Sequence, residues 1–204
     1  MDGTLVDSLG IWADIDRRFF LLHQREVPEE YEQRIAHMNF VDIAKFTKNE
    51  YGFQESIEEI MKIWTDWSME AYRNDILAKP GAKEFLAYIK NELKLPITLA
   101  TANRKELYEP CLKRNRLDEF FSHALNVNDL NSTKGEPLIY QKLAEFMHTE
   151  PKETLVFEDI LIAVRTAHNA GFRVAAVYDK GNRKDAREII ENSDFYITSY
   201  PEIV

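Results

Sequence analysis

The chain has 204 residues, of which 45% are hydrophobic and 12% aromatic, and its formal net charge is -9. This apolar content excludes a largely disordered chain, and the apolar runs are far too short to span a membrane. Phosphate-backbone affinity needs clustered Lys and Arg, so the acidic balance argues against a nucleic-acid binder. Because Cys111 is the single cysteine, no internal disulfide can form. No secretory signal pattern opens the chain, and we expect a cytoplasmic protein.

The segment from residue 9 to about residue 75 has a helical pattern throughout. Apolar residues recur there at three- and four-residue spacing and predict one apolar stripe on the first helix: Trp12, Ile15, Phe19 and Leu22. A long helix is predicted after Ser56, which forms a capping-box pattern with Glu59. Shorter helices fit residues 28–36 and 41–49.

After residue 80 the pattern alternates between strands and helices of about ten residues. Strands are predicted at residues 97–100, 123–127, 154–157, 174–178 and 195–198. Helices are predicted at residues 82–91, 105–113, 138–147, 160–169 and 185–191. This alternation indicates a Rossmann-like α/β fold with a doubly wound parallel sheet. We therefore expect a core domain of residues 1–8 and 79–204 with an inserted helical domain of residues 9–78.

Polar residues follow two of the predicted strands, at the sheet edge where ligands bind in such folds. Glu158 and Asp159 end one strand. Adjacent acids are common at a helix N-terminus, but paired carboxylates also hold Mg²⁺. Thr101, Ala102 and Asn103 end another strand, where a hydroxyl and free backbone N–H groups can bind an anion or simply cap the helix.

Two further segments carry candidate chemistry. Lys134 lies in a turn-rich loop just before a helix, where a lysine is usually a solvated charge but can also neutralise a phosphoryl group. The opening run from residue 1 to residue 8 reads Met-Asp-Gly-Thr-Leu-Val-Asp-Ser and is the most specific of these segments.

These segments, in this order, resemble the haloacid dehalogenase superfamily of phosphohydrolases, in the branch with β-phosphoglucomutase and phosphoglycolate phosphatase. The first family motif is Asp-x-Asp-Gly-Thr-Leu-x-Asp-Ser, matched by residues 1–8 from its second position. Thr101 matches the second motif, Lys134 the third, and Glu158 with Asp159 the fourth. The resemblance covers the whole chain and implies that residues 9–78 form a helical cap.

The resemblance also implies roles. Asp2 would be the general acid/base and lend its backbone carbonyl to Mg²⁺, with Asp159 as a metal ligand and Glu158 beside it. The phosphoryl oxygens would be bound by the hydroxyl and amides of the second motif together with the turn of the first: Gly3, Thr101, Ala102 and Asn103. Lys134 would bridge the phosphate and the nucleophile, so Asp2, Thr101 and Lys134 form the implied catalytic set.

The family's nucleophilic Asp stands two residues before the acid/base, which is one position before Met1. Either the sequence is truncated upstream, or the protein starts here and forms no aspartyl-phosphate. A missing central strand would leave buried backbone groups unpaired at about 1–3 kcal/mol each, which favours truncation.

We expect a Mg²⁺-dependent hydrolase of a small-molecule phosphomonoester, acting as a monomer with neither nucleic acid nor membrane as partner. Alternatives are a sugar phosphomutase, or a non-catalytic phosphate and Mg²⁺ module if Met1 is the true start. The stretch around His37 lacks the Lys–Arg pair of β-phosphoglucomutase, which weakens the mutase interpretation. Trp12, His37 and Asn39 could face the substrate, although the favoured interpretation places Trp12 and Phe40 in the cap core.

Overall fold

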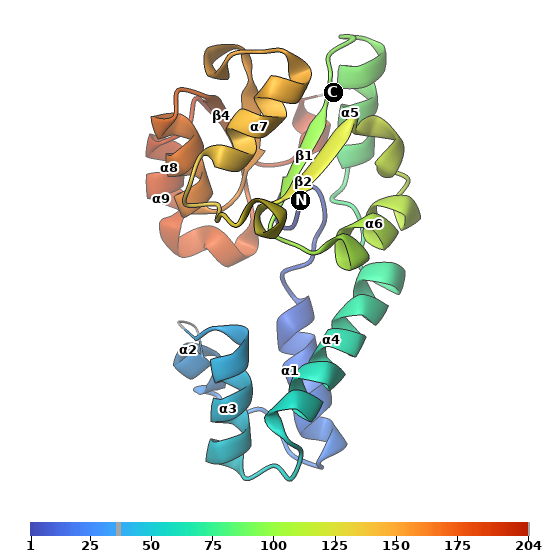
Figure 1. The fold of residues 1–204 in the computed structure, drawn as a ribbon, viewed down its shortest axis with the longest axis vertical. Helices are drawn as coiled ribbons and strands as arrows, with labels where there is room; N and C mark the ends of the chain where they lie inside the picture. Colours follow the sequence, from blue (N-terminus) through green and yellow to red (C-terminus); the bar gives the residue numbers. More distant parts are fainter. Residues whose placement is uncertain (36–37, 204) are drawn as a thin grey trace. The chain divides into compact units, whose positions relative to one another are not determined.

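Residues 1–35 and 38–203 are described by the computed structural model shown in Figure 1. The chain divides into one unit of Met1–Leu9 with Ile76–Val204 and a second unit of Gly10–Asp75. None of the helices within the described ranges has the length and apolarity that a membrane span requires.

The Gly10–Asp75 unit is helical, as its pattern predicts. Its helices are α1 (Ile11–Leu22), α2 (Tyr31–Ile35), α3 (Phe40–Tyr51) and α4 (Ile57–Asn74). The capping box of α4 is present: the Glu59 amide donates to Ser56 Oγ at 3.1 Å, and the Ser56 amide donates to Glu59 Oε2 at 2.7 Å. The last residue of the predicted helix at 28–36 lies outside the described residues.

An aromatic cluster forms the core of this helical unit. The rings of Phe19 and Phe20 both contact Phe53 edge-on, at centroid distances of 5.0 and 5.3 Å. Of the predicted apolar stripe on α1, Ile15 and Phe19 are buried, whereas Trp12 and Leu22 are 45% and 59% exposed. The buried face is instead Ile11, Ile15, Phe19 and Phe20. Two adjacent phenylalanines, Phe19 and Phe20, thus both enter the core.

The other unit alternates strands and helices, close to the predicted ranges. Its strands are β1 (Thr98–Thr101), β2 (His123–Asn126), β3 (Leu155–Glu158), β4 (Arg173–Val177) and β5 (Phe195–Ile197). Its helices are α5 (Ala82–Asn91), α6 (Lys105–Arg114), α7 (Leu138–Met147), α8 (Leu161–Asn169) and α9 (Ala186–Glu191). All strand pairs are parallel, which confirms the predicted fold class.

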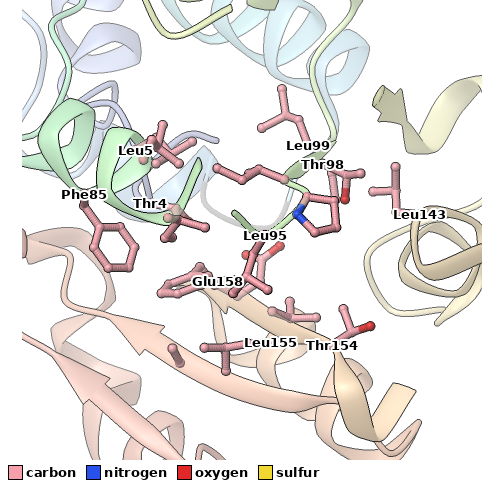
Figure 2. Close-up of a pocket in the computed structure, with 18 of the residues that line it drawn as sticks. Thr4, Leu5, Phe85, Leu95, Thr98, Leu99, Leu143, Thr154, Leu155 and Glu158 are labelled. Atoms are coloured by element: carbon pink, nitrogen blue, oxygen red, sulfur yellow. The ribbon is translucent and has the colours of Figure 1, made fainter. Parts of the chain in front are cut away.

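The strands form two sheets rather than one continuous sheet. β1 pairs with β2, and β3 with β4 and β5, so within the described residues β1 and β3 each have one paired side. A cavity of about 710 Å³ lies between them, with a mostly apolar lining that includes Met1, Leu99 and Leu155. Figure 2 shows Leu99 and Thr98 on one side of this space and Leu155 and Glu158 on the other.

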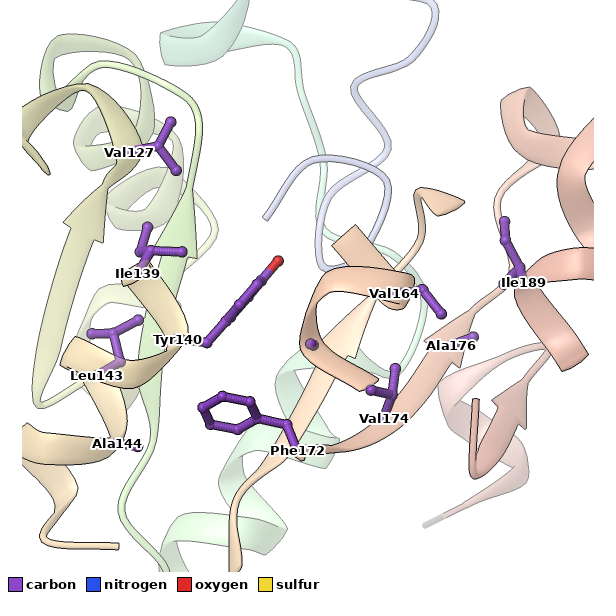
Figure 3. Packing of buried hydrophobic residues seen from close by; sticks show 11 residues of the cluster. Val127, Ile139, Tyr140, Leu143, Ala144, Val164, Phe172, Val174, Ala176 and Ile189 are labelled. Atoms are coloured by element: carbon purple, nitrogen blue, oxygen red, sulfur yellow. The ribbon is translucent and has the colours of Figure 1, made fainter. Parts of the chain in front are cut away.

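A hydrophobic cluster between α7, α8 and β4 holds this unit together (Figure 3). Ile139, Val164 and Val174 are fully buried in it. Tyr140 of α7 is also a member, although it carries a hydroxyl group that needs a hydrogen-bond partner when buried. That hydroxyl reaches the end of β3, so the core directly supports the polar residues there.

The two connections to the helical unit are paired with each other. Val6 forms an antiparallel bridge with Ala78. The Asp7 amide donates to the Leu77 carbonyl at 3.0 Å, and the Lys79 amide donates to the Leu5 carbonyl at 2.8 Å. The chain thus leaves this unit and returns to it through one short ladder.

Candidate active site

The opening segment folds into a tight turn at the carboxyl ends of β1 and β3. The Met1 carbonyl accepts from the amides of Thr4, Leu5 and Val6 at 3.2, 2.7 and 3.2 Å. Gly3 has a φ of +67°, and a Cβ there would lie 2.1 Å from Asp159 Oδ2. Only glycine therefore fits this position, for both backbone and steric reasons.

Both oxygens of the Asp2 carboxylate accept hydrogen bonds. Ser8 Oγ donates to Oδ1 and Asn103 Nδ2 donates to Oδ2, each at 2.7 Å. The Asn103 amide in turn donates to Thr101 Oγ1 at 3.1 Å, and Thr101 is buried at the end of β1. Asp2 is therefore tied to the second motif, and its carboxylate is held in one orientation.

Lys134 is a buried ion-pair partner rather than a solvated surface charge. Its Nζ lies 2.6 Å from Glu158 Oε1, and the two side chains are only 12% and 3% exposed. The Tyr140 hydroxyl donates to the same oxygen at 3.0 Å. Burial acts to lower the Lys134 pKa, but the carboxylates of Glu158, Asp159 and Asp2 together outweigh it, and the net shift is upward. Burial acts to raise the Glu158 pKa, but Lys134, the Met1 amino group and the Tyr140 hydroxyl together outweigh it, and the net shift is downward. Both members of the pair are thus held in their charged forms.

Asp159 connects the opening turn to the loop after β4. Thr4 Oγ1 donates to its Oδ1 at 2.8 Å, and Asn182 Nδ2 donates to its Oδ2 at 3.0 Å. Burial, followed by the neighbouring Glu158 charge, raises the pKa of Asp159. A nearby cation would relieve both effects, because it favours the ionised carboxylate.

The donor chemistry of these acids suits a hard divalent cation. Glu158 Oε2 is buried and has no hydrogen-bond partner in the described part of the chain. Carboxylate oxygens are the ligands that Mg²⁺ prefers. Among residues 1–35 and 38–203, however, no three His, Cys, Asp or Glu side chains are arranged so that they could hold a metal ion together. Glu158 and Asp159 therefore provide the kind of ligand atom that Mg²⁺ prefers, and Glu158 Oε2 is the oxygen available to bind it.

The structure brings most of the predicted site residues to this one edge. Asp2 and Gly3 lie on the opening turn, while Thr101 and Asn103 follow β1. Lys134 precedes α7, and Glu158 and Asp159 end β3. Ala102 is exposed, and its carbonyl accepts from Asn128 Nδ2 at 3.2 Å.

Four polar residues of this region are absent from the sequence prediction: Lys79, Tyr140, Asp179 and Asn182. Tyr140 belongs to an apolar helical stripe, so nothing in the pattern marks it. Asp179 and Asn182 follow β4, and an acid just beyond the end of a predicted strand is a signal that could have found them.

The candidate residues of the helical unit have structural contacts of their own. The exposed Trp12 contacts the half-buried Phe40 at a centroid distance of 5.9 Å, and Phe40 also contacts Trp64 at 5.8 Å. Asn39 caps α3 by accepting from the Asp42 amide at 3.0 Å. His37 lies outside the described residues.

Comparisons with known proteins decide the family. The family model described as haloacid dehalogenase-like hydrolase matches residues 1–177. The chain belongs to this family. It is 23% identical to a phosphorylated carbohydrates phosphatase of Thermotoga maritima, over 100% of this chain and 94% of that protein. It is 30% identical to the pyrophosphatase PpaX of Bacillus cereus strain Q1, over 87% of this chain and 80% of that protein. The chain also matches two longer Arabidopsis thaliana proteins and covers 62% and 46% of their lengths.

The fold has close counterparts among solved structures. A Thermotoga maritima protein provisionally named beta-phosphoglucomutase superposes with a TM-score of 0.88 at 22% identity, over 100% of this chain and 93% of that one. The haloacid dehalogenase-like hydrolases thus include this chain by sequence and by fold, and the curated relatives named above are phosphatases.

Proposed function

We propose that this haloacid dehalogenase-like hydrolase is a Mg²⁺-dependent phosphatase of a small-molecule phosphomonoester that acts through an aspartyl-phosphate. One observation carries the proposal. Asp2, Lys134 and the Glu158–Asp159 pair come from three distant segments and meet at the carboxyl edge of the parallel strands. This constellation supplies a proton-transfer group, a cation and two metal-type carboxylates, which phosphoryl transfer requires.

The roles follow from the contacts. Asp2, held by Ser8 and Asn103, would protonate the leaving alkoxide as the P–O ester bond breaks and would later take a proton from the attacking water. Lys134 is held charged at the end of β3 and would offset the charge on the transferring group. Thr101, with the amides of Ala102 and Asn103 and the turn at Gly3, would bind phosphoryl oxygens.

Glu158 and Asp159 would hold the Mg²⁺ ion. The unpartnered, buried Glu158 Oε2 supports this assignment, as does the raised pKa of Asp159. When bound, the ion would neutralise charge on the phosphoryl group. The Asp2 carbonyl, as a further metal ligand, belongs to the same proposal.

The nucleophile would be an Asp placed directly before Met1. Its carboxylate would attack the phosphorus in line, and water would then hydrolyse the resulting aspartyl-phosphate. The Met1 amino group supports this position. Met1 is buried, and this nitrogen lies within reach of the charges of Lys134, Asp2, Glu158 and Asp159. A residue bonded to this nitrogen would therefore enter the candidate site.

The cavity between β1 and β3 supports the same proposal. Within the described residues both strands have one side without a strand partner, which faces this cavity, and Met1, Thr4 and Leu5 line it. A short apolar strand leading into Met1 would end at the same edge as its neighbours and run parallel to them. It would join the two sheets into one and pair their backbone groups, each of which otherwise costs about 1–3 kcal/mol if buried.

The test compares this chain with one carrying its upstream coding sequence, against sugar, nucleotide and glycolate phosphates with and without Mg²⁺. We expect the extended chain to release inorganic phosphate and the present chain to be inert. An extended chain that is inert across the panel would refute the hydrolase, and an upstream codon for a residue other than Asp would refute the nucleophile.

A sugar phosphomutase is the second candidate, because the superposed Thermotoga maritima protein carries that provisional name. The two activities are separated by their products. A mutase returns an isomeric sugar phosphate, whereas the phosphatase releases inorganic phosphate. A chain that binds Mg²⁺ and phosphate without turnover in either form would instead be a non-catalytic module.

A further inference from the structure

Lys79 lies next to the candidate site but cannot serve as an additional substrate-binding cation. Its Nζ contacts the Gly3 carbonyl, the Tyr178 carbonyl at 2.8 Å and Asp179 Oδ2 at 2.9 Å. An ammonium group has three N–H donors, so these three acceptors use all of them. The side chains of Lys79 and Asp179 are 15% and 3% exposed, which makes this a buried ion pair.

Asp179 also begins a tight turn that its own side chain and carbonyl stabilise. Its Oδ1 accepts from the Gly181 amide at 2.9 Å, and its carbonyl accepts from the Asn182 amide at 3.1 Å. The turn presents Asn182, whose Nδ2 donates to Asp159 Oδ2 at 3.0 Å. The lysine is thus connected to Asp159 through a set of short, directional contacts.

These contacts close into a ring. Thr4, which follows Gly3 in the chain, donates to the other oxygen of Asp159 at 2.8 Å. Each oxygen of the Asp159 carboxylate is therefore held by a different segment, and Lys79 ties the two segments together. A carboxylate fixed on both sides loses little conformational freedom when a ligand binds to it.

We propose that Lys79, Asp179 and Asn182 are positioning residues that set the orientation of the Asp159 carboxylate for metal binding. We call these three residues the Lys79 brace. The proposal rests on the proposed function to the extent that Asp159 binds Mg²⁺. The orientation of Asp159 itself is a structural property that can be measured without activity.

The test uses Asn182→Ala and Asp179→Asn in the upstream-extended protein, with Lys180→Met as the matched control. Lys180 lies on the same turn, but its exposed side chain approaches Asp7 at 3.9 Å and is outside the brace. Lys79→Met would leave the buried Asp179 unpaired, so Lys79 is tested as the double variant Lys79→Met/Asp179→Leu. Mg²⁺ affinity is measured by calorimetry without substrate, together with kcat, KM and a crystal structure of each variant.

We expect the brace variants to bind Mg²⁺ about 10-fold more weakly or worse, the usual cost of removing an outer-shell partner. Their kcat should fall while KM changes by less than about twofold, and Lys180→Met should match the parent. Unchanged Mg²⁺ affinity with only a lower melting temperature would overturn the proposal, and so would a raised KM at unchanged affinity.

Failure of the proposed function gives a different result. If the parent protein itself does not bind Mg²⁺, the metal role of Asp159 is wrong. The crystal structures then decide the brace: a shifted Asp159 side chain in Asn182→Ala supports positioning, and an unshifted one overturns it.

Discussion

Replacing Lys134 with methionine tests the electrostatics of the site independently of its activity. The substitution removes the ammonium 2.6 Å from Glu158 Oε1 and leaves the carboxylate buried, with the Tyr140 hydroxyl still donating to it. Breaking one side of a buried ion pair costs about 3–5 kcal/mol. At about 2–4 °C per kcal/mol for a chain of this size, the melting temperature should fall by roughly 6–20 °C at pH 7.

The stability lost in Lys134→Met should depend on pH, and the direction of that dependence follows from the pKa of Glu158. In the parent protein the Glu158 pKa is lowered, so its contribution to stability is present above the unfolded value near 4.5 and is lost on acidification. Without Lys134, burial dominates and raises that pKa, so the contribution of Glu158 is instead lost as the pH rises. The difference in melting temperature should therefore grow from pH 4 towards pH 7, and shrink further as the pH falls through the lowered pKa of Glu158.

The assay is thermal unfolding followed by circular dichroism between pH 4 and pH 8. Lys134→Met/Glu158→Gln is the matched variant. It also removes the buried carboxylate that Lys134→Met leaves without a cation, and it should therefore recover much of the lost stability. Equal melting temperatures of the parent and the single variant across this range would show that the ion pair is not buried as described, and the reasoning would fail.

Three further perturbations have expected outcomes. In the upstream-extended protein, Asp2→Asn should lower turnover by about 10²-fold or more, and near-parental kcat would refute the acid/base role. Asp159→Ala should raise the Mg²⁺ concentration for half-maximal activity, whereas an unchanged titration would remove Asp159 from the metal site. Burial raises the pKa of Asp16 to about 7 from 3.8, so its ionisation costs stability as the pH rises through this window. Linkage limits that cost to about 4 kcal/mol, and Asp16→Asn should raise the melting temperature at pH 8 but not at pH 4; a pH-independent effect would contradict this.

The sequence predicts the secondary structure well where local signals act. The capping box at Ser56 and the alternation after residue 80 place most elements within a residue or two of their observed bounds. Local patterns do not settle which face of α1 is buried. Trp12 satisfies the helical period as well as Ile11 does, and the choice depends on the aromatic rings contributed by distant segments.

Part of the site could be predicted because Thr101 and Asp159 follow strands, and parallel strands bring their carboxyl ends together. The positions of Asp2 and Lys134 come from the family motifs, and the motifs do not give their partners. The partner of Lys134 is set by how α7 packs on the strands, and the pairing of Lys79 with Asp179 depends on a contact between residues 100 positions apart.

The ladder formed by Leu5–Asp7 and Leu77–Lys79 has an evolutionary consequence. The whole helical segment enters and leaves the other unit at one point, with its two ends already bonded to each other. Such an insertion can lengthen, shorten or diverge while the geometry at its base stays the same. Selection could therefore alter the helical unit without disturbing the acids and the lysine at the strand ends, and one set of reactive groups could serve many members of a lineage.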